Sequence, residues 1–286
     1  MESDTLSVGG HRPPEATPFL APARFGFLTR QFLILSQGLY GSGGFALLAI
    51  SVGVAKIFKS RNVVWPEIRR QILNCGVRQI PIAAFMALAL GFVVAGQLLV
   101  LKTVTGVQSQ IYAGGAMVTI VVRELGCMAI TLLALARNGT AMVIELGAAR
   151  VKGETLALQA VGVDPIHYFV VPRVVGQSLS VCCLSFGFNL LATASVYVFL
   201  YALGFTLPLS EYLDQLATYL RPLDFLFLVL KPALFGAVVG CVCCQQGLMC
   251  PTKLEHIAAA TTTAVVVTLV VCVLLNGFFV GLFYLL

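Results

Sequence analysis

The sequence has very little charge for its length. Only 10% of its 286 residues are charged, whereas hydrophobic residues make up 59% and the mean hydropathy is +0.95. A water-soluble domain carries about 25% charged residues, so this composition excludes an ordinary soluble protein. The apolar residues suffice for several helical spans of about 20 residues each, and an all-α polytopic membrane protein is therefore predicted.

The sequence also lacks the patterns of several other classes. Its net charge of +6 does not indicate nucleic-acid binding, because the basic residues lie beside apolar segments. No G-x-x-x-x-G-K-[ST] phosphate loop occurs. Cys241, Cys243, Cys244 and Cys250 do not have the C-x2-C spacing of zinc sites, and most other cysteines lie in apolar runs. No disulfide framework, metal site or catalytic residue is predicted.

The first 79 residues differ from the rest of the chain. Residues 1–22 are polar and proline-rich, without the basic start of a signal peptide, and are predicted to form a disordered cytoplasmic tail. Residues 23–79 are predicted to form an interfacial or elbow helical segment. Within it, Phe25–Ile57 is apolar but is interrupted by Arg30, Gln31 and several glycines. This pattern fits an interfacial helix, a re-entrant hairpin or a weak span.

Residues 80–286 are predicted to form a membrane domain with five spans. The spans are expected at about Ile80–Leu101, Ile111–Ala136, within Val174–Leu209, at Phe225–Gln246 and at Ala258–Leu286. Lysine and arginine are concentrated before the first span and between the second and third. The positive-inside rule therefore predicts a cytoplasmic N-terminus and an extracytoplasmic C-terminus. The absence of an internal repeat disfavours an inverted-repeat secondary transporter.

Three charged residues are predicted to lie inside the membrane. Arg123 and Glu124 are expected near the middle of the second span, and Lys231 lies in the fourth. Charges inside a bilayer are costly, so they face a cavity or a partner. Adjacent helical residues point about 100° apart. One of the pair is therefore expected to face Lys231 while the other lines a cavity; alternatively, all three form a buried ion network that holds spans together.

Residues 137–173, between the second and third spans, are predicted to be a cytoplasmic region. Asn138-Gly139-Thr140 predicts a break in the helix, followed by short helices at Ala141–Ala149 and Glu154–Val161 and a turn at Gly162–Pro165. The charge pattern alone fits an ordinary solvated connection. The alternation of helices and turns favours a compact protrusion on which a soluble motor subunit can act.

The motifs in this part of the chain resemble those of the MlaE/YrbE permeases. These are the membrane subunits of ABC lipid transporters associated with mammalian-cell-entry (MCE) proteins. Their R-E-L-x-P, A-G-R-x-G-[ST]-A, A-E-[LI]-G, A-L, D-P and P-R motifs have counterparts here in the same order, and the resemblance covers about residues 65–286. The matching positions are Arg123, Glu124, Leu125, Arg137, Gly139, Thr140, Ala141, Glu145, Leu146, Gly147, Ala157, Leu158, Asp164, Pro165, Pro172, Arg173 and the segment Lys231–Gly240. The departures are Cys127, Ala136, Ile144 and Glu154, the last lying one place late.

The resemblance implies a specific assembly. It implies a permease with an interfacial N-terminal helix and five spans, paired with a second copy or with a paralogue, in the bacterial inner membrane. It also implies an MCE-domain protein on the outer side and a lipid cavity between the two permeases. ATP would be used by a separate ABC ATPase, with no cofactor bound by this chain. The residues expected at the ATPase coupling helix are Arg137, Glu145, Gly147, Arg150, Glu154, Asp164 and Pro165.

Two other classes of function remain as alternatives. A stand-alone secondary transporter would use Arg123, Glu124 and Lys231 as an ion-coupling site. An intramembrane enzyme would need a nucleophile with its base, or a set of metal ligands, within the spans. His167 and His256 lie outside the predicted spans, so the enzyme is the weaker alternative.

Overall fold

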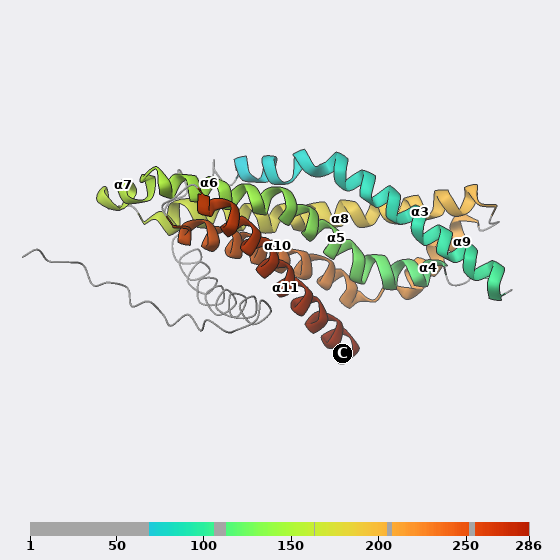
Figure 1. The fold of residues 1–286 in the computed structure, drawn as a ribbon. Helices are drawn as coiled ribbons and strands as arrows, with labels where there is room; N and C mark the ends of the chain where they lie inside the picture. The colour runs from blue at the N-terminus through green and yellow to red at the C-terminus, as the bar shows by residue number, and fades with distance from the viewer. Residues whose placement is uncertain (1–68, 106–112, 163, 205–207, 252–254, 286) are drawn as a thin grey trace, which may run out of the picture.

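The computed structural model describes residues 69–105, 113–162, 164–204, 208–251 and 255–285 (Figure 1). This part of the chain is 93% helical and contains no strand. Five of its helical runs are long and apolar enough to cross a membrane, which confirms the prediction of an all-α polytopic membrane protein. The predicted tail and most of the predicted interfacial segment, including Phe25–Ile57, lie outside the described residues.

The five long helical runs include several labelled elements. They are Arg69–Val104, Met117–Val151, Tyr168–Ala202, Pro222–Met249 and Glu255–Phe283. The elements, in chain order, are η1 (Val77–Gln79), α3 (Ile80–Thr105), α4 (Ala113–Ala116), η3 (Met117–Leu125), α5 (Gly126–Ala134), η4 (Leu135–Gly139), α6 (Thr140–Val151), α7 (Glu154–Ala160), η5 (Ile166–Val170), α8 (Val171–Ala202), α9 (Leu209–Tyr219), α10 (Pro222–Met249) and α11 (Glu255–Leu285).

The long helices form a bundle in which α8 is central. It packs against α3 and α5 and also against α10, which in turn contacts α6 and α11. Helix α7 lies at one end of the bundle, and α4 and α9 lie at the other (Figure 1). Helix α11 crosses the bundle obliquely, and its C-terminal end diverges from the other helices (Figure 1).

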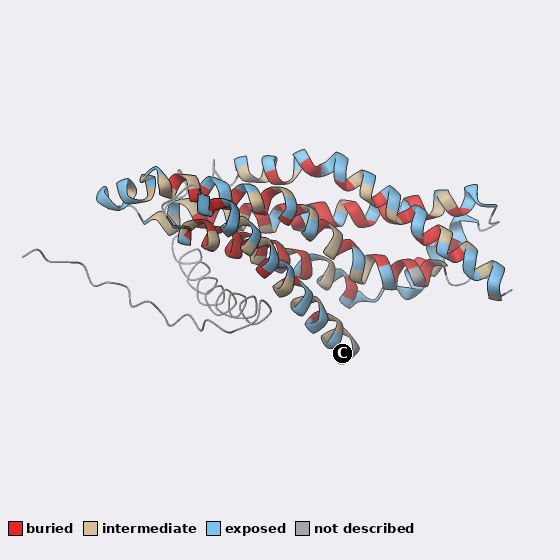
Figure 2. Ribbon diagram, in the orientation of Figure 1, coloured by how far each residue is buried: buried red, intermediate tan, exposed pale blue. Residues whose placement is uncertain are grey.

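The outer surface of the bundle is largely apolar. Buried residues follow the inner faces of the helices, while the outward faces are exposed (Figure 2). The exposed side chains include Phe85, Val104 and Leu274, with 72%, 77% and 62% of their surface accessible. A monomeric soluble protein rarely exposes large contiguous apolar patches, whereas a membrane span presents such side chains to lipid.

The predicted break at Asn138-Gly139-Thr140 is wrong, because one helical run continues from Met117 to Val151. The Thr140 hydroxyl donates to the carbonyl of Ala136 at 2.8 Å, inside the helix. A side chain at Gly139 would place its Cβ 2.9 Å from the Sγ of Cys243 on α10. Gly139 therefore permits close helix packing instead of a turn. The continuous helix also places Arg123 and Glu124 near its start instead of its middle.

Helix α7 is set between two glycines in left-handed conformations. Gly153 has φ of 77° and Gly162 has φ of 81°, a region that residues with a Cβ rarely adopt. The predicted short helix at Glu154–Val161 is confirmed as α7. Beyond α7, the Asp164 carboxylate accepts a 3.0 Å hydrogen bond from the Ile166 N–H at the start of η5.

At the opposite end, α9 is anchored to the bundle by Tyr212. Its buried ring packs beside Tyr197 of α8, with ring centroids 5.4 Å apart. Its hydroxyl donates to the Thr193 carbonyl at 3.1 Å, and burial raises the pKa of this phenol above its usual value. These contacts position the α9–α10 junction, which contributes to the site described below.

Helix α11 contains three consecutive threonines whose hydroxyl groups bond within the helix itself. Thr261, Thr262 and Thr263 donate to the carbonyls four residues earlier, at 2.8, 3.1 and 3.0 Å. Such bonds satisfy polar side chains in an apolar environment. Only 22% of the most apolar stretch of this helix is buried, so α11 is the least enclosed of the five long helices.

Candidate functional site

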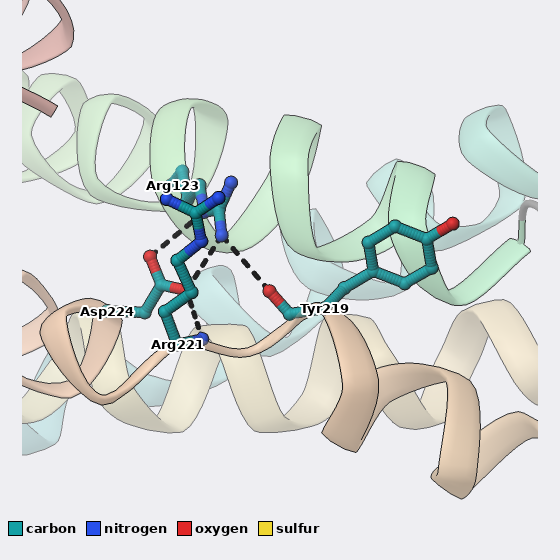
Figure 3. Close-up of polar contacts among 4 residues, drawn as sticks. All are labelled: Arg123, Tyr219, Arg221 and Asp224. Carbon is teal, nitrogen blue, oxygen red and sulfur yellow. Dashed lines mark hydrogen bonds and ion pairs between the residues drawn. The ribbon is translucent and has the colours of Figure 1, made fainter. Parts of the chain in front are cut away.

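A cluster of charged side chains joins the start of the second span to the start of the fourth. The Arg123 guanidinium donates from Nε to Oδ1 of Asp224 at 2.9 Å and from Nη2 to Oδ2 at 2.8 Å (Figure 3). Its Nη2 also donates to the Tyr219 carbonyl at 3.1 Å. The Arg221 N–H donates to Oδ2 of Asp224 at 2.8 Å. Paired N–H···O bonds of this kind are among the strongest in proteins and fix the orientation of both groups.

The second half of the cluster connects the second, fourth and fifth spans. The Lys231 ammonium donates to the Arg123 carbonyl at 2.8 Å and lies 3.6 Å from Oε2 of Glu124. The Asn276 amide on α11 donates to the same carboxylate oxygen at 3.0 Å. The structure thus brings the predicted Arg123, Glu124 and Lys231 together, and Asn276 completes the connection to α11.

Burial makes these pairings necessary. The side chains of Asp224 and Lys231 are only 2% and 6% exposed, whereas those of Arg123 and Glu124 are 20% and 35% exposed. The Phe283 ring covers the Arg123 guanidinium, with its centroid 4.4 Å from Cζ. An unpaired charge in such surroundings costs several kcal/mol. The cluster therefore stabilises the contact between three spans near one end of the bundle.

The space beside the cluster is small. A cavity of about 30 Å³, lined by Glu124, Lys231, Asn189 and Phe279 among others, adjoins the charges. This is enough for about two water molecules and is too small for a phosphate headgroup. Within a single chain, the geometry therefore favours the ion-network interpretation over a preformed lipid site at these residues.

Asp224 is the central residue that sequence reasoning missed. It was part of a polar stretch before the fourth predicted span and had no partner nearby in sequence. The available signal was its position three residues after Arg221 and two after Pro222, because an acidic residue in the first turn caps a helix. The structure has this capping arrangement at the start of α10. The same carboxylate then pairs with Arg123 on another helix.

Part of the predicted coupling set gathers around α7. Arg150, Asp164 and Pro165 line a groove of about 490 Å³ together with Leu156 of α7. Glu154 is exposed at the start of α7. These residues form a surface at the end of the bundle that is opposite to the charge cluster.

The other three predicted coupling residues lie elsewhere on the second span. The Arg137 guanidinium donates to the Arg78 carbonyl at 3.2 Å. Glu145 pairs with Arg173 of α8 at 3.0 Å. Gly147 is buried, and a Cβ at this position would lie 3.3 Å from Ile257 of α11. The seven residues therefore do not form a single surface.

The sequence matches the family model described as Permease MlaE over residues 68–282, which covers all five long helices and both groups of residues described above. The chain belongs to the MlaE permease family. This confirms the resemblance found in the R-E-L and D-P motifs. It also assigns the protein to a family of transport subunits.

Curated relatives of this MlaE permease support the same assignment. A probable ABC transporter permease protein of Rickettsia prowazekii is 28% identical over 249 residues, which cover 82% of this chain and 93% of the relative. The chloroplastic protein TRIGALACTOSYLDIACYLGLYCEROL 1 of Arabidopsis thaliana is 26% identical over 220 residues, 76% of this chain and 61% of that protein. The names of the bacterial relatives indicate the permease subunit of an ABC transporter, which works with an ATPase. They favour this function over a stand-alone secondary transporter.

A buried amide network lies in the half of the MlaE permease nearer to α7. The Gln79 amide donates to Oδ1 of Asn138 at 2.7 Å, and the Asn138 amide donates to Oε1 of Gln177 at 3.1 Å and to the Cys75 carbonyl at 3.3 Å. Gln79 and Gln177 are fully buried, and Asn138 is 8% exposed. The network links the first three spans, and sequence reasoning did not identify it.

Replacing Asn138 by alanine is expected to lower the unfolding free energy by about 1–3 kcal/mol, because the amide groups of Gln79 and Gln177 lose their partners while buried. The melting midpoint of the purified permease measures this effect. Thr262→Ala is the control, since this exposed residue donates its hydroxyl hydrogen bond only to its own helix. Equal melting midpoints of both variants and the wild type would show that the amide network does not contribute to stability.

Proposed function

We propose that this chain is the transmembrane permease subunit of an ABC transporter that moves phospholipid or a related lipid between the bacterial inner membrane and an extracytoplasmic MCE-type protein. The observation that carries the proposal is the match to the MlaE permease model across all five spans. The name of the Arabidopsis relative contains a galactolipid, trigalactosyldiacylglycerol, which supports a lipid as the substrate class.

In this proposal, ATP binds to a partner subunit and no cofactor binds to this chain. Helix α7 is the coupling element, because it projects from the bundle between the left-handed Gly153 and Gly162 (Figure 1). One helical run, Met117–Val151, leads from the α7 end to Arg123 and Glu124 at the opposite end. Movement of α7 by the ATPase would therefore shift the charge cluster through a continuous helix and change the lipid affinity of the cavity.

The distribution of basic residues supports the proposed orientation. The α7 end carries most of the lysine and arginine in the described spans and connections, namely Arg69, Arg70, Arg78, Arg137, Arg150, Lys152 and Arg173. The α9 end carries Lys102, Arg123, Arg221 and Lys231. By the positive-inside rule, α7 lies in the cytoplasm and α9 lies on the outer side, where the MCE-type protein binds.

We further propose that two permease copies form the lipid cavity together. The cavity beside Arg123 and Glu124 in one chain holds about 30 Å³, so a lipid needs additional space. The exposed apolar face of α11, which includes Leu274 and Phe278, is a surface on which a second copy can pack. A homodimer is the simplest arrangement, and a heterodimer with a paralogous permease would use the same face.

Replacing Glu124 by glutamine tests the role of the cluster in transport. The variant loses the charge that pairs with Lys231, and a hydrogen bond to a charged group contributes about 1.5–3 kcal/mol. Lipid transfer in vesicles reconstituted with the ATPase and the MCE-type protein is therefore expected to fall about tenfold or more, with the complex still assembled. Glu255→Gln, at the exposed start of α11, is the control.

Pull-down of the ATPase with the Glu124→Gln permease separates the two interpretations of the cluster. If the variant still binds the ATPase but transfers lipid slowly, Glu124 has a role in the lipid path. Loss of the assembled complex would instead assign Glu124 to the ion network alone. Transfer at the wild-type rate would contradict both roles.

A further inference from the structure

We propose that a groove between the start of the first span and α8 binds an anionic phospholipid of the cytoplasmic leaflet, separately from the transported lipid. The groove has a volume of about 260 Å³, and its lining includes Ile72, Gly76, Ile80, Ser180, Gly187 and Leu191. It does not adjoin the Arg123 cluster, whose cavity has a different lining. The proposal requires only that the chain spans a membrane in the proposed orientation.

The shape of the groove fits part of an acyl chain. Small residues keep it open, and a Cβ at Gly187 would meet no atom within 4 Å. The groove has a largely apolar lining and a volume of about 260 Å³, so a flexible hydrocarbon chain can enter it.

A buried polar side chain in the wall of the groove is consistent with a ligand that has a hydrogen-bond acceptor. Ser180 lines the groove, is only 2% exposed, and its Oγ has no hydrogen-bond partner in the described part of the chain. A buried hydroxyl without a partner costs about 1–3 kcal/mol. When the Ser180 hydroxyl rotates toward the groove, the ester carbonyl of a phospholipid, which lies between the acyl chain and the phosphate, can accept this bond.

Arginines at the cytoplasmic end of the groove provide the charge complementarity. Arg69 lies one helical turn before Ile72, so their side chains share a face of the helix. Arg69 and Arg70 are exposed, and neither forms an ion pair with a described acidic residue. Arginine matches the geometry of a phosphate group, and basic pockets between spans on the cytoplasmic side bind anionic headgroups.

Photocrosslinking in nanodiscs tests the proposal directly. The purified permease is placed in phosphatidylcholine that contains a small fraction of phosphatidylglycerol with a photoactivatable acyl chain, and the adducts are mapped by mass spectrometry. Adducts are expected within residues 72–84 and 180–191. Their yield is expected to exceed that from phosphatidylcholine with the same acyl chain. Arg69→Gln should reduce this preference about fivefold, whereas Lys102→Gln, at the other end of the same span, should not change it.

A steric variant tests the acyl-chain part of the site. Gly187→Phe places a ring in the open groove and is expected to remove the adducts, as is the smaller change Gly187→Leu. Gly96→Phe is the matched control, because a Cβ there also meets no atom within 4 Å and Gly96 does not line the groove.

Three results would overturn the proposal. One is an equal adduct yield from phosphatidylglycerol and phosphatidylcholine. Another is an adduct yield that Gly187→Phe and Gly187→Leu leave unchanged. The third is the absence of adducts from these segments together with crosslinks to another polypeptide or to residues 1–68, which would show that protein covers the groove. The assay uses neither ATP nor a partner subunit, so a result against the lipid site would not contradict the proposed transport function.

Discussion

Replacing Asp224 by alanine is expected to destabilise the permease by about 3–5 kcal/mol, because it leaves the largely buried Arg123 guanidinium without its counterion. The same change removes the acceptor of the Arg221 N–H at the start of α10. At about 2–4 °C per kcal/mol for a chain of this size, the melting midpoint should fall by roughly 10 °C. Thermal melting of the purified protein in detergent measures this shift.

A double variant distinguishes loss of the pair from exposure of an unpaired charge. Arg123→Met combined with Asp224→Leu removes both charges and is expected to melt closer to the wild type than Asp224→Ala does, since the main cost of breaking a buried pair is the charge that remains. If Asp224→Ala melted at the wild-type temperature, the pair would not be holding the second and fourth spans together.

Replacing Leu156 by aspartate is expected to weaken binding of the ATPase about thirtyfold or more while leaving the permease folded. Leu156 is 69% exposed on α7 and lines the groove beside Arg150 and Asp164. A well-packed apolar side chain at the centre of an interface contributes about 2 kcal/mol or more, and aspartate would place a charge there. Binding of the purified ATPase to permease in nanodiscs measures the change, and coupled lipid transfer should fall with it.

The matched control for this second prediction is Leu209→Asp. Leu209 is 51% exposed on α9, at the opposite end of the bundle, so its replacement should not affect the ATPase. Unchanged ATPase affinity of the Leu156→Asp variant would show that α7 is not the coupling element. Charge reversal at Glu145 is a less specific probe, because it would also replace the carboxylate that pairs with Arg173 at 3.0 Å by a group of like charge.

The spans could be predicted from the sequence because their apolar runs are long and nearly free of charge. The ends of the spans were predicted less accurately where polar side chains form hydrogen bonds inside a helix. Asn138, Gly139 and Thr140 have the composition of a turn, yet Thr140 bonds to its own helix and Gly139 fits closely against Cys243. Local propensity favoured a break there, and packing between α6 and α10 overrode it.

The candidate site could be predicted only in part for a related reason. Arg123, Glu124 and Lys231 were identifiable because charges are rare in apolar segments. Asp224 was not, because it lies at the edge of a polar connection and its partner is 101 residues away in sequence. The two ends of the buried network around Asn138 are likewise far apart in the chain. Such pairings follow from the tertiary arrangement of the helices and have no local pattern.

The three threonines of α11 have a consequence for motion between helices. Because Thr261, Thr262 and Thr263 each bond to a carbonyl of their own helix, this stretch can slide or tilt against α6 without breaking a hydrogen bond. The resistance to such a movement comes from dispersion contacts, such as those between Ile257 and Gly147, which re-form readily at a new position. Lipid acyl chains can form equivalent dispersion contacts with these residues, so losing the helix–helix contacts costs little free energy. The N-terminal part of α11 can therefore move against α6, whereas Asn276 holds its C-terminal part to Glu124 and the bonds of Asp224 and Asn138 hold the other spans together.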